Sequence, residues 1–311
     1  MPARPASTRP PARARPRVGP DGGAGPLARA EPPAPQDLVI TLLGSYVRGR
    51  HETVWSGGLV ILLEELGFTN GAARVALTRV VNRGLIDRVR QGRLVHYRIT
   101  PRAERVLAEG DVRIFSLGHP RDDASCWTFL WHQIPEDRRL ERGRLGRRLR
   151  FLGFGSLQDS VWVSPHDHEA EVVELLDELD MAGYASVVLA PSASARGLRV
   201  VASRAWDLRG LADRYAAFTA EFGGYVGACE RLTDGQAFLV RTRLIQLFRV
   251  FPFLDPELPE DLAPLAAERE RAVATFDALW GALARGAKRH FDAAVSGYPP
   301  VTRGGAGAGG P

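Results

Sequence analysis

The stretch "TNGAARVALTRVVNRGLIDRVRQGRLVHYRIT", from Thr69 to Thr100, changes in its middle from helical to strand periodicity. Residues 70–83 carry apolar side chains at three- and four-residue spacing, which predicts a helix that Thr69 caps and Gly84 ends. The segments "LIDRVR" and "RLVHYRI" alternate on either side of Gln91-Gly92, which predicts two strands and a tight turn. The stretch therefore predicts a short helix followed by a basic β-hairpin.

The predicted helix has an outer face that is small, polar and cationic. At about 100° per residue, Ala73, Ala76, Leu77 and Val80 point toward the core, and no bulky side chain stands on the opposite side. Such a face suits the major groove of DNA, where arginine pairs with guanine, asparagine or threonine reaches base edges, and valine contacts a thymine methyl. The candidate DNA-binding residues of this helix are Thr69, Ala72, Arg74, Val75, Thr78, Arg79, Asn82 and Arg83.

The predicted hairpin is basic around its turn, where phosphates lie beside a groove-bound helix. Val95, Tyr97 and Ile99 share one face of its second strand. The candidate DNA-binding residues of the hairpin are Arg88, Arg90, Gln91, Arg93 and Arg98. Together with a supporting helix over 56–66, this arrangement predicts a winged helix-turn-helix domain. Two other interpretations stay open: the arginines only make a small helical domain soluble, or the winged domain binds another protein.

Residues 36–118 are predicted to form this first domain. Its first helix is expected to run to Val47 with Asp37 as its cap, and the helix over 56–66 is expected to end at Gly67. Thr100-Pro101 is expected to open a last helix that Gly110 ends.

Residues 119–206 alternate strand and helix. An arginine-rich helix is expected over 135–152 and an acidic one over 167–181, while "LGFGS" is interpreted as a lone glycine turn. The expected strands are "CWTFLWHQI", "SVWVSP", "ASVVLAP" and "LRVVASR". This βαββαβ-like order is consistent with a ferredoxin-like sandwich. Residues 207–297 have helical periodicity throughout and predict a helical third domain, so the fold class is α+β.

Composition places the chain among globular proteins with flexible ends. Its 311 residues are 45% hydrophobic, and no apolar run reaches the roughly 18 residues of a membrane span, so no membrane partner is expected. Residues 1–35 are predicted to be a disordered tail rich in Arg and Pro, which can add nonspecific attraction to phosphate, and 298–311 a flexible tail. Cys126 and Cys229 lack metal spacing and indicate a reducing, cytoplasmic setting.

Six phrases of the sequence together resemble the PaaX family of bacterial transcriptional regulators, over residues 37–258. They are "LLGSYV", "TVWSGGLVILLEELGF", "ARVALTRVVNRGLI", "YRITPRAERVLAEG", "LRFLGFGSLQDSVWVSP" and "WDLRGLADRYAAF". The resemblance implies a winged-helix domain, a central domain similar to the ferredoxin-like Cas2 proteins, and a helical C-terminal domain. It also implies a homodimer that binds a double-stranded DNA operator and is released by a small aryl-CoA such as phenylacetyl-CoA. The arginine-rich N-terminal tail departs from the family pattern.

The Cas2 likeness raises a metal-dependent nuclease as an alternative function. That chemistry requires a carboxylate at the end of the first strand, where this chain has Trp131, His132 and Gln133. The pair His166 and His168 is expected to be solvated at a helix start, with Ser164 or Asp167 as its cap, rather than to hold a metal. We therefore expect no enzyme activity, no metal and no cofactor.

An aryl-CoA effector requires basic residues for its phosphates and an apolar pocket for its acyl group. Some arginines of the helix over 135–152 are expected to pair with the acidic helix, and the sequence does not locate the pocket. One candidate set is Arg138, Arg139, Arg142, Arg144, Arg147, Arg148 and Arg150. The other is Arg241, Arg243 and Arg249 with Phe248, Phe251 and Phe253. The prediction is a dimeric, cytoplasmic, ligand-released repressor.

Overall fold

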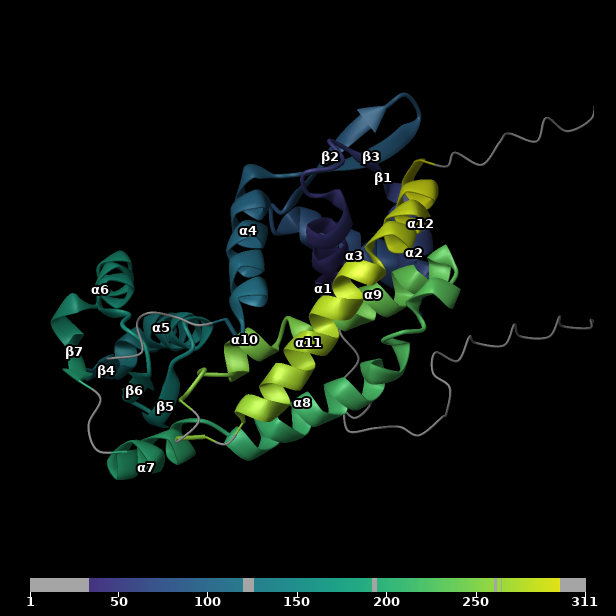
Figure 1. The fold of residues 1–311 in the computed structure, drawn as a ribbon. Helices are drawn as coiled ribbons and strands as arrows, with labels where there is room; N and C mark the ends of the chain where they lie inside the picture. Colours follow the sequence, from purple (N-terminus) through teal and green to yellow (C-terminus); the bar gives the residue numbers. More distant parts are fainter. Residues whose placement is uncertain (1–33, 120–125, 192–194, 260–261, 264, 297–311) are drawn as a thin grey trace, which may run out of the picture.

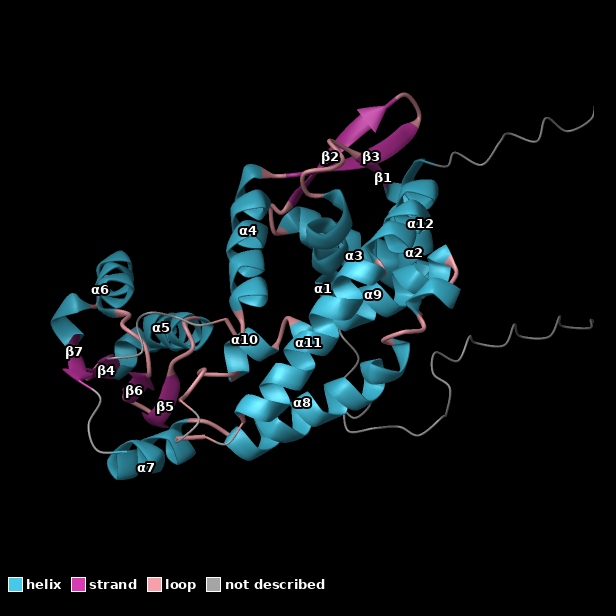
Figure 2. Ribbon diagram, viewed as in Figure 1, coloured by secondary structure: helices cyan, strands magenta, loops and turns pink. Residues whose placement is uncertain are grey.

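The computed structural model describes residues 34–119, 126–191, 195–259, 262–263 and 265–296 (Figure 1). The tails predicted over 1–35 and 298–311 lie outside this part of the chain, apart from residues 34 and 35. The described chain is a mixed structure of helices and two separate sheets (Figure 2). None of its described helices is long and apolar enough to cross a bilayer.

The N-terminal elements form a helical body from which a hairpin projects (Figure 2). The sheet is antiparallel, with strand order β1-β3-β2. The elements are α1 (Pro35–Leu42), its π-helical continuation η2 (Leu43–Val47), β1 (Val54–Trp55), α2 (Ser56–Glu65), α3 (Asn70–Asn82), β2 (Ile86–Gln91), β3 (Leu94–Ile99) and α4 (Pro101–Ser116).

Local signals set most of these boundaries. The Thr69 hydroxyl accepts a hydrogen bond from the Ala72 N–H at the start of α3, and Gly84 follows its end with a φ of 66° that favours glycine. Two expectations were wrong. Asp37 does not cap α1, which starts after Ala34 without a side-chain cap. Gly110 lies inside α4, which continues to Ser116 because apolar side chains beyond the glycine still pack against the core.

The central region is a four-stranded antiparallel sheet of order β5-β6-β4-β7. Two helices, α5 and α6, cover one face and enclose a small core of their own with Leu130 and Trp162. The elements are β4 (Cys126–His132), a 3-10 turn (Glu136–Arg138), α5 (Arg139–Phe151), β5 (Gly155–Gln158), β6 (Val161–Ser164), α6 (Glu169–Glu178), a second 3-10 turn (Ala182–Tyr184) and β7 (Ala185–Pro191).

The expectation that "LRVVASR" is a strand was wrong, because these residues belong to helix α7 (Ala195–Ala205). Leu198 and Ala202, four residues apart, are both buried, as one face of a helix requires. The remaining strand of the sheet is β5, in the segment that had been interpreted as a glycine turn. A Cβ atom at Gly155 would lie 2.8 Å from the Ala205 carbonyl oxygen, so glycine permits the close packing of α7 on β5.

The C-terminal region is helical and shares one hydrophobic core with α1, α2 and α3. The ring of Tyr46 from η2 stacks on Phe291 at 5.0 Å between centroids. A Cβ atom at Gly58 in α2 would lie only 2.4 Å from the Ala294 carbonyl oxygen, so glycine permits this contact. The elements are α8 (Leu208–Phe222), two 3-10 turns (Gly223–Tyr225 and Cys229–Arg231), α9 (Asp234–Phe248), α10 (Phe251–Leu254), α11 (Ala266–Ala282) and α12 (Ala284–Ser296).

The segment Asp255–Glu257 joins the three regions. The buried Asp255 carboxylate binds Arg269 and Tyr215 of the C-terminal helices. The Pro256 carbonyl lies 3.0 Å from Nε2 of His166 in the central region, and the Glu257 carboxylate accepts a hydrogen bond from the Gly118 N–H, just after α4. These contacts fix the central region and the end of α4 against the helical body.

Candidate nucleic-acid interface

Helix α3 presents the outer face expected from its sequence. Ala73, Ala76, Leu77 and Val80 are buried, whereas Val75 is 50% exposed in the middle of the helix. Ala72 is half-buried. The other candidate residues of the helix are exposed: Thr69, Arg74, Thr78, Arg79, Asn82 and Arg83.

Hydrogen bonds divide these exposed side chains into two groups. Arg74 Nε donates to Asn70 Oδ1 at 2.8 Å, and Thr78 Oγ1 donates to the Arg74 carbonyl at 3.0 Å, so both side chains have local partners. Among the described residues, the side chains of Arg79 and Asn82 have no hydrogen bond or ion pair. Their donors are therefore available to an outside partner.

The hairpin carries its candidate residues on the exposed surface. Arg88, Arg90, Gln91, Arg93 and Arg98 are all exposed, and Gly92 makes the turn with a φ of 60°. Gln91 Nε2 donates to Thr53 Oγ1 at 3.0 Å, which ties the tip to the loop before β1. Arg98 lies 4.0 Å from the Asp87 carboxylate across the strands.

The helix and the hairpin are held together at their junction. Thr100 Oγ1 donates to the Gly84 carbonyl at 2.8 Å, and the Arg102 guanidinium donates to the Arg83 carbonyl at 3.2 Å. The Arg88 guanidinium lies 3.5 Å from Thr78 Oγ1, which brings the first strand of the hairpin beside the outer face of α3. The two candidate sets from the sequence therefore form one surface, hereafter the contact face, made of the exposed residues of α3 and the hairpin.

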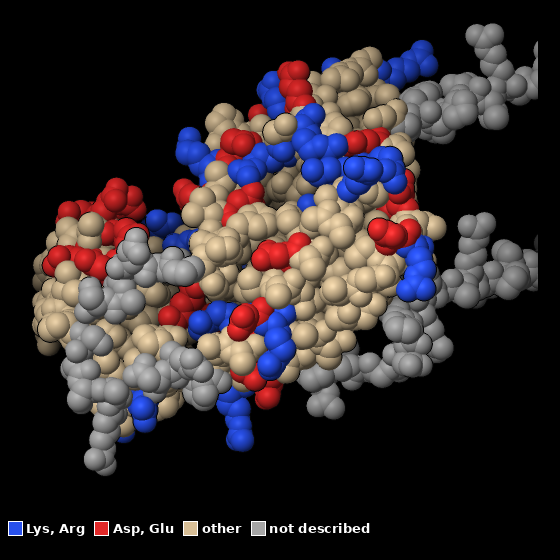
Figure 3. All heavy atoms as spheres, in the orientation of Figure 1, with Lys and Arg blue, Asp and Glu red and all other residues tan. Residues whose placement is uncertain are grey.

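Charge is distributed unevenly over the molecule. Figure 3 shows a band of basic side chains just below the hairpin, over the upper end of α12, and acidic side chains gathered over α6. A polyanion is therefore attracted to the hairpin end of the molecule and repelled from the α6 end.

Comparisons with known proteins cover most of the described chain. Family models match three consecutive parts: "PaaX-like protein" over residues 34–103, "PaaX protein central Cas2-like domain" over 120–199, and "PaaX-like protein C-terminal domain" over 206–293. The transcriptional repressor PaaX of Escherichia coli (strain K12) is 30% identical over 244 residues, which is 76% of either chain. The chain belongs to the PaaX family. The contact face lies within the first matched part.

A solved structure shares the fold of this PaaX-family chain. It is the uncharacterized protein Rv0674 from Mycobacterium tuberculosis, which superposes with a TM-score of 0.51 at 23% sequence identity. The match covers 84% of this chain and 98% of that one, and at this identity it concerns the fold alone.

The Cas2-like domain places aromatic and imidazole groups where a nuclease needs carboxylates. At the end of β4, Trp131 is 44% exposed and His132 is buried. Burial, with a smaller effect of the Arg142 guanidinium, lowers the pKa of His132. Within the described ranges, no group of three or more His, Cys, Asp or Glu side chains is placed to hold a metal ion.

The histidines after β6 differ from expectation in both their exposure and the capping of α6. His166 is buried rather than solvated, and its Nε2 lies at hydrogen-bond distance from the carbonyl of Pro256, which is far away in the sequence. His168 Nδ1 lies 2.6 Å from the Glu171 carboxylate. Asp167 accepts a hydrogen bond from the Glu169 N–H at 3.1 Å, but α6 begins after His168 without a side-chain cap, so the expectation that Ser164 or Asp167 caps it was wrong.

The structure does not bring either candidate effector set together in one pocket. On α5 and the turn before it, Arg138 pairs with Asp180, Arg142 pairs with Glu136, and Arg150 lies over the Trp162 ring. In the second set, Arg241 is buried against Trp280, Arg243 pairs with Glu221, and Arg249 donates to Thr41. Phe248 and Phe251 are core residues.

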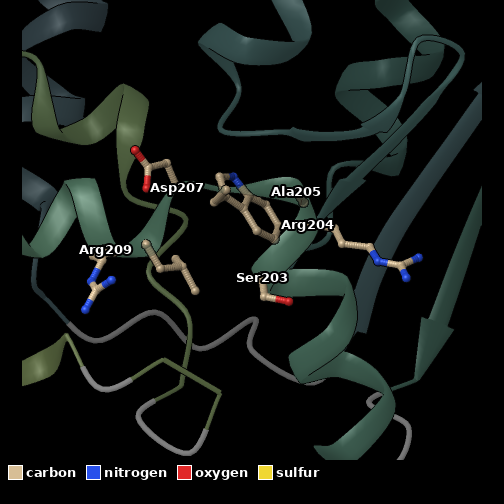
Figure 4. A pocket seen from close by; sticks show the side chains of 7 residues that line it. Ser203, Arg204, Ala205, Asp207 and Arg209 are labelled. Atoms are coloured by element: carbon tan, nitrogen blue, oxygen red, sulfur yellow. The ribbon is translucent and has the colours of Figure 1, made fainter.

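Two open hollows that the sequence did not indicate lie at junctions between regions. One, of about 570 Å³, is at the turn between α7 and α8 and is lined by Trp206 and Asp207. Figure 4 shows that its two guanidiniums, Arg204 and Arg209, extend in opposite directions, so they do not form a phosphate clamp. The other, of about 390 Å³, lies between α4, α5 and α6. The first hollow is lined by the consecutive residues 203–209, which carry no recognisable motif, and the second is formed by elements that meet only in the fold.

Proposed function

We propose that this PaaX-family protein is a sequence-specific DNA-binding transcriptional repressor whose residues 36–118 form a winged helix-turn-helix domain. The observation that carries the proposal is the contact face, where α3 exposes small and cationic side chains beside a basic hairpin. The named relative from Escherichia coli is a transcriptional repressor. No large side chain on α3 prevents the helix from entering a major groove about 12 Å wide.

Each part of the contact face has a distinct role in this proposal. Arg79, whose guanidinium has no partner in the described chain, pairs with guanine, and Val75 contacts a thymine methyl group. The arginines around the turn of the hairpin, Arg90 and Arg93, neutralise phosphates. Base contacts give the selectivity, and phosphate contacts give position and salt dependence.

The remaining regions provide assembly and regulation. In this proposal residues 119–206 form a ferredoxin-like, Cas2-like domain and residues 207–297 a helical domain, and neither has an enzymatic role. Two chains form a dimer that binds half-sites about one helical turn, or a multiple of it, apart. An aryl-CoA or a related small molecule binds the dimer more tightly in its DNA-free geometry than in its DNA-bound geometry, and so releases the dimer from its operator.

Selection from a randomised DNA library tests the DNA-binding role. We expect the unaltered protein at physiological salt to enrich an inverted repeat. Arg79→Ala should enrich the same sequence with relaxed preference at one position of each half-site, whereas Arg209→Ala, at an exposed arginine of α8, should leave the profile unchanged. Absence of any enriched sequence would refute the proposal, and an unchanged profile for Arg79→Ala would refute the role of that residue.

A further inference from the structure

Strand β7 forms an open edge of the central sheet that nothing in the described chain covers. Its sequence, "ASVVLAP", contains no charged residue, and its one proline is the last residue. It is the outermost strand, hydrogen-bonded on one side to β4 (Figure 2). Natural proteins protect such edges with charged residues, central prolines or covering elements, so a neutral open edge is a surface for pairing with another strand.

The free hydrogen-bonding groups of this edge follow from the alternation along β7. Gln133 N–H donates to the Tyr184 carbonyl at 2.8 Å, which shows that Tyr184 faces β4. Because facing and open positions alternate along an antiparallel strand, Ser186, Val188 and Ala190 also face β4. Ala185, Val187 and Leu189 therefore direct their backbone groups to the open edge.

An apolar patch lies next to this edge on one face of the sheet. Val188 is opposite Phe129 in β4, and Trp131 lies two residues further along the same face. Val188 is 43% exposed and Trp131 is 44% exposed. Helix α7 packs on β5 at the other side of this face, where Val163 is buried, and leaves the β7 side uncovered.

We propose that a second copy of this chain pairs its own β7 with this edge, antiparallel and about a twofold axis at Val188. In that register Val187 stands opposite Leu189 of the partner subunit, and both residues direct their N–H and C=O groups to the new neighbour. Four hydrogen bonds close around the axis as a result. Pro191, which lacks an N–H, falls opposite Ala185 at the ends of the pairing, where it accepts one bond without requiring another.

Self-complementarity is the reason for choosing a second copy over a different peptide. A twofold axis at any residue of β7 pairs outward-facing residues only with outward-facing residues, and an axis at Val188 also brings the two exposed Val188 side chains together and keeps Pro191 at the ends of the pairing. An edge without charge repels no copy of itself and selects no charged partner. The two Val188 side chains and the flanking Trp131 residues then cover one another. The result joins two sheets into one and identifies the interface of the dimer in the proposed function, on which the inference rests.

A cysteine at the axis tests this register directly in the full chain. In the proposed pairing the two Val188 positions form a non-hydrogen-bonded pair with Cα atoms about 4.5 Å apart, a separation that a disulfide spans. We expect Val188→Cys to give a disulfide-linked dimer under mild oxidation. Val173→Cys on α6, at a valine that is 46% exposed, is the matched control and should stay unlinked.

Sedimentation velocity supplies the second measurement. The unaltered chain should sediment at twice its 33.9 kDa mass, Val188→Lys should sediment as a monomer with an unchanged far-UV circular dichroism spectrum, and Val173→Lys should remain dimeric. A dimer in which Val188→Cys does not cross-link and Val188→Lys does not dissociate would overturn this interface while leaving DNA binding intact. An unaltered chain that sediments as a monomer would also overturn it. Loss of the proposed function would be seen separately, as the absence of an enriched DNA sequence.

Discussion

Replacing Asp255 by Asn should strongly destabilise the helical body. The Asp255 carboxylate is buried, with Oδ2 accepting from Arg269 Nε and from the Tyr215 hydroxyl at 2.6 Å each, and Oδ1 accepting from the other Arg269 nitrogen at 2.8 Å. Asparagine removes the negative charge and turns an amide N–H₂ group toward these donors. The Arg269 guanidinium is then left largely buried without a counter-charge.

The magnitude follows from the loss of one partner of a buried ion pair, which costs about 3–5 kcal/mol. The cooperative unit that shares the main core includes the N-terminal and C-terminal helices, and for a unit of this size such a loss lowers the melting temperature by roughly 6–20 °C. Tyr215→Phe removes one hydrogen bond to the same carboxylate and should cost about 1.5–3 kcal/mol.

Equilibrium unfolding in urea, followed by tryptophan fluorescence, measures these changes. Asp213→Asn is the control, because Asp213 is an exposed residue of α8. It should change the free energy of unfolding by less than about 0.5 kcal/mol. If Asp255→Asn costs no more than this control, the carboxylate does not hold the segment Asp255–Glu257 as the structure indicates.

Three further predictions concern the other parts of the chain. Burial lowers the pKa of His132 in the folded state, so its contribution to stability is present above the ordinary histidine pKa of about 6.5 and is lost as the pH falls below it. Melting temperatures at pH 8 and pH 5 should therefore differ less in His132→Gln than in the unaltered protein. The control His119→Gln, at an exposed histidine, should keep the full difference. Arg93→Ala should weaken binding to all DNA sequences alike and reduce the slope of log affinity against log salt by about 1, which titrations at several salt concentrations will show; an altered base preference would contradict a phosphate contact. Gly58→Ala should destabilise the protein by about 1–3 kcal/mol, because its Cβ would meet the backbone of α12. Gly110→Ala, at an open position inside α4, should stabilise the protein by about 0.5–1 kcal/mol in the same urea titration. Changes of the same sign in the two free energies of unfolding would contradict the packing of Gly58 against α12.

The elements that the sequence predicted well are those fixed by local signals. The start of α3 at the Thr69 cap, its end before Gly84 and the turn after Gln91 each depend on residues within one helical turn or one hairpin. The amphipathic spacing of α3 also separated its buried from its exposed positions, because that division requires only the helical period.

The elements that the sequence missed depend on contacts between distant residues. The pair Val200-Val201 in α7 favoured a strand, but burial of Leu198 and Ala202 against β5 selects a helix. The four residues of β5 include a glycine and form a strand only because β6 pairs with them. His166 is buried and contacts the Pro256 carbonyl, which no local pattern predicts. The candidate effector arginines were similarly grouped by sequence proximity, although they lie on different sides of their helices.

The central claim is that α3 reads base sequence through its exposed face, and a double-mutant cycle between Arg79 and its base pair tests it most directly. Binding free energies are measured for the unaltered protein and Arg79→Ala, each on the selected operator and on an operator with one guanine replaced. We predict a coupling energy of about 1–3 kcal/mol at one guanine of each half-site, and none at the neighbouring positions. Additive effects at every base pair of the operator would contradict the claim that Arg79 reads DNA.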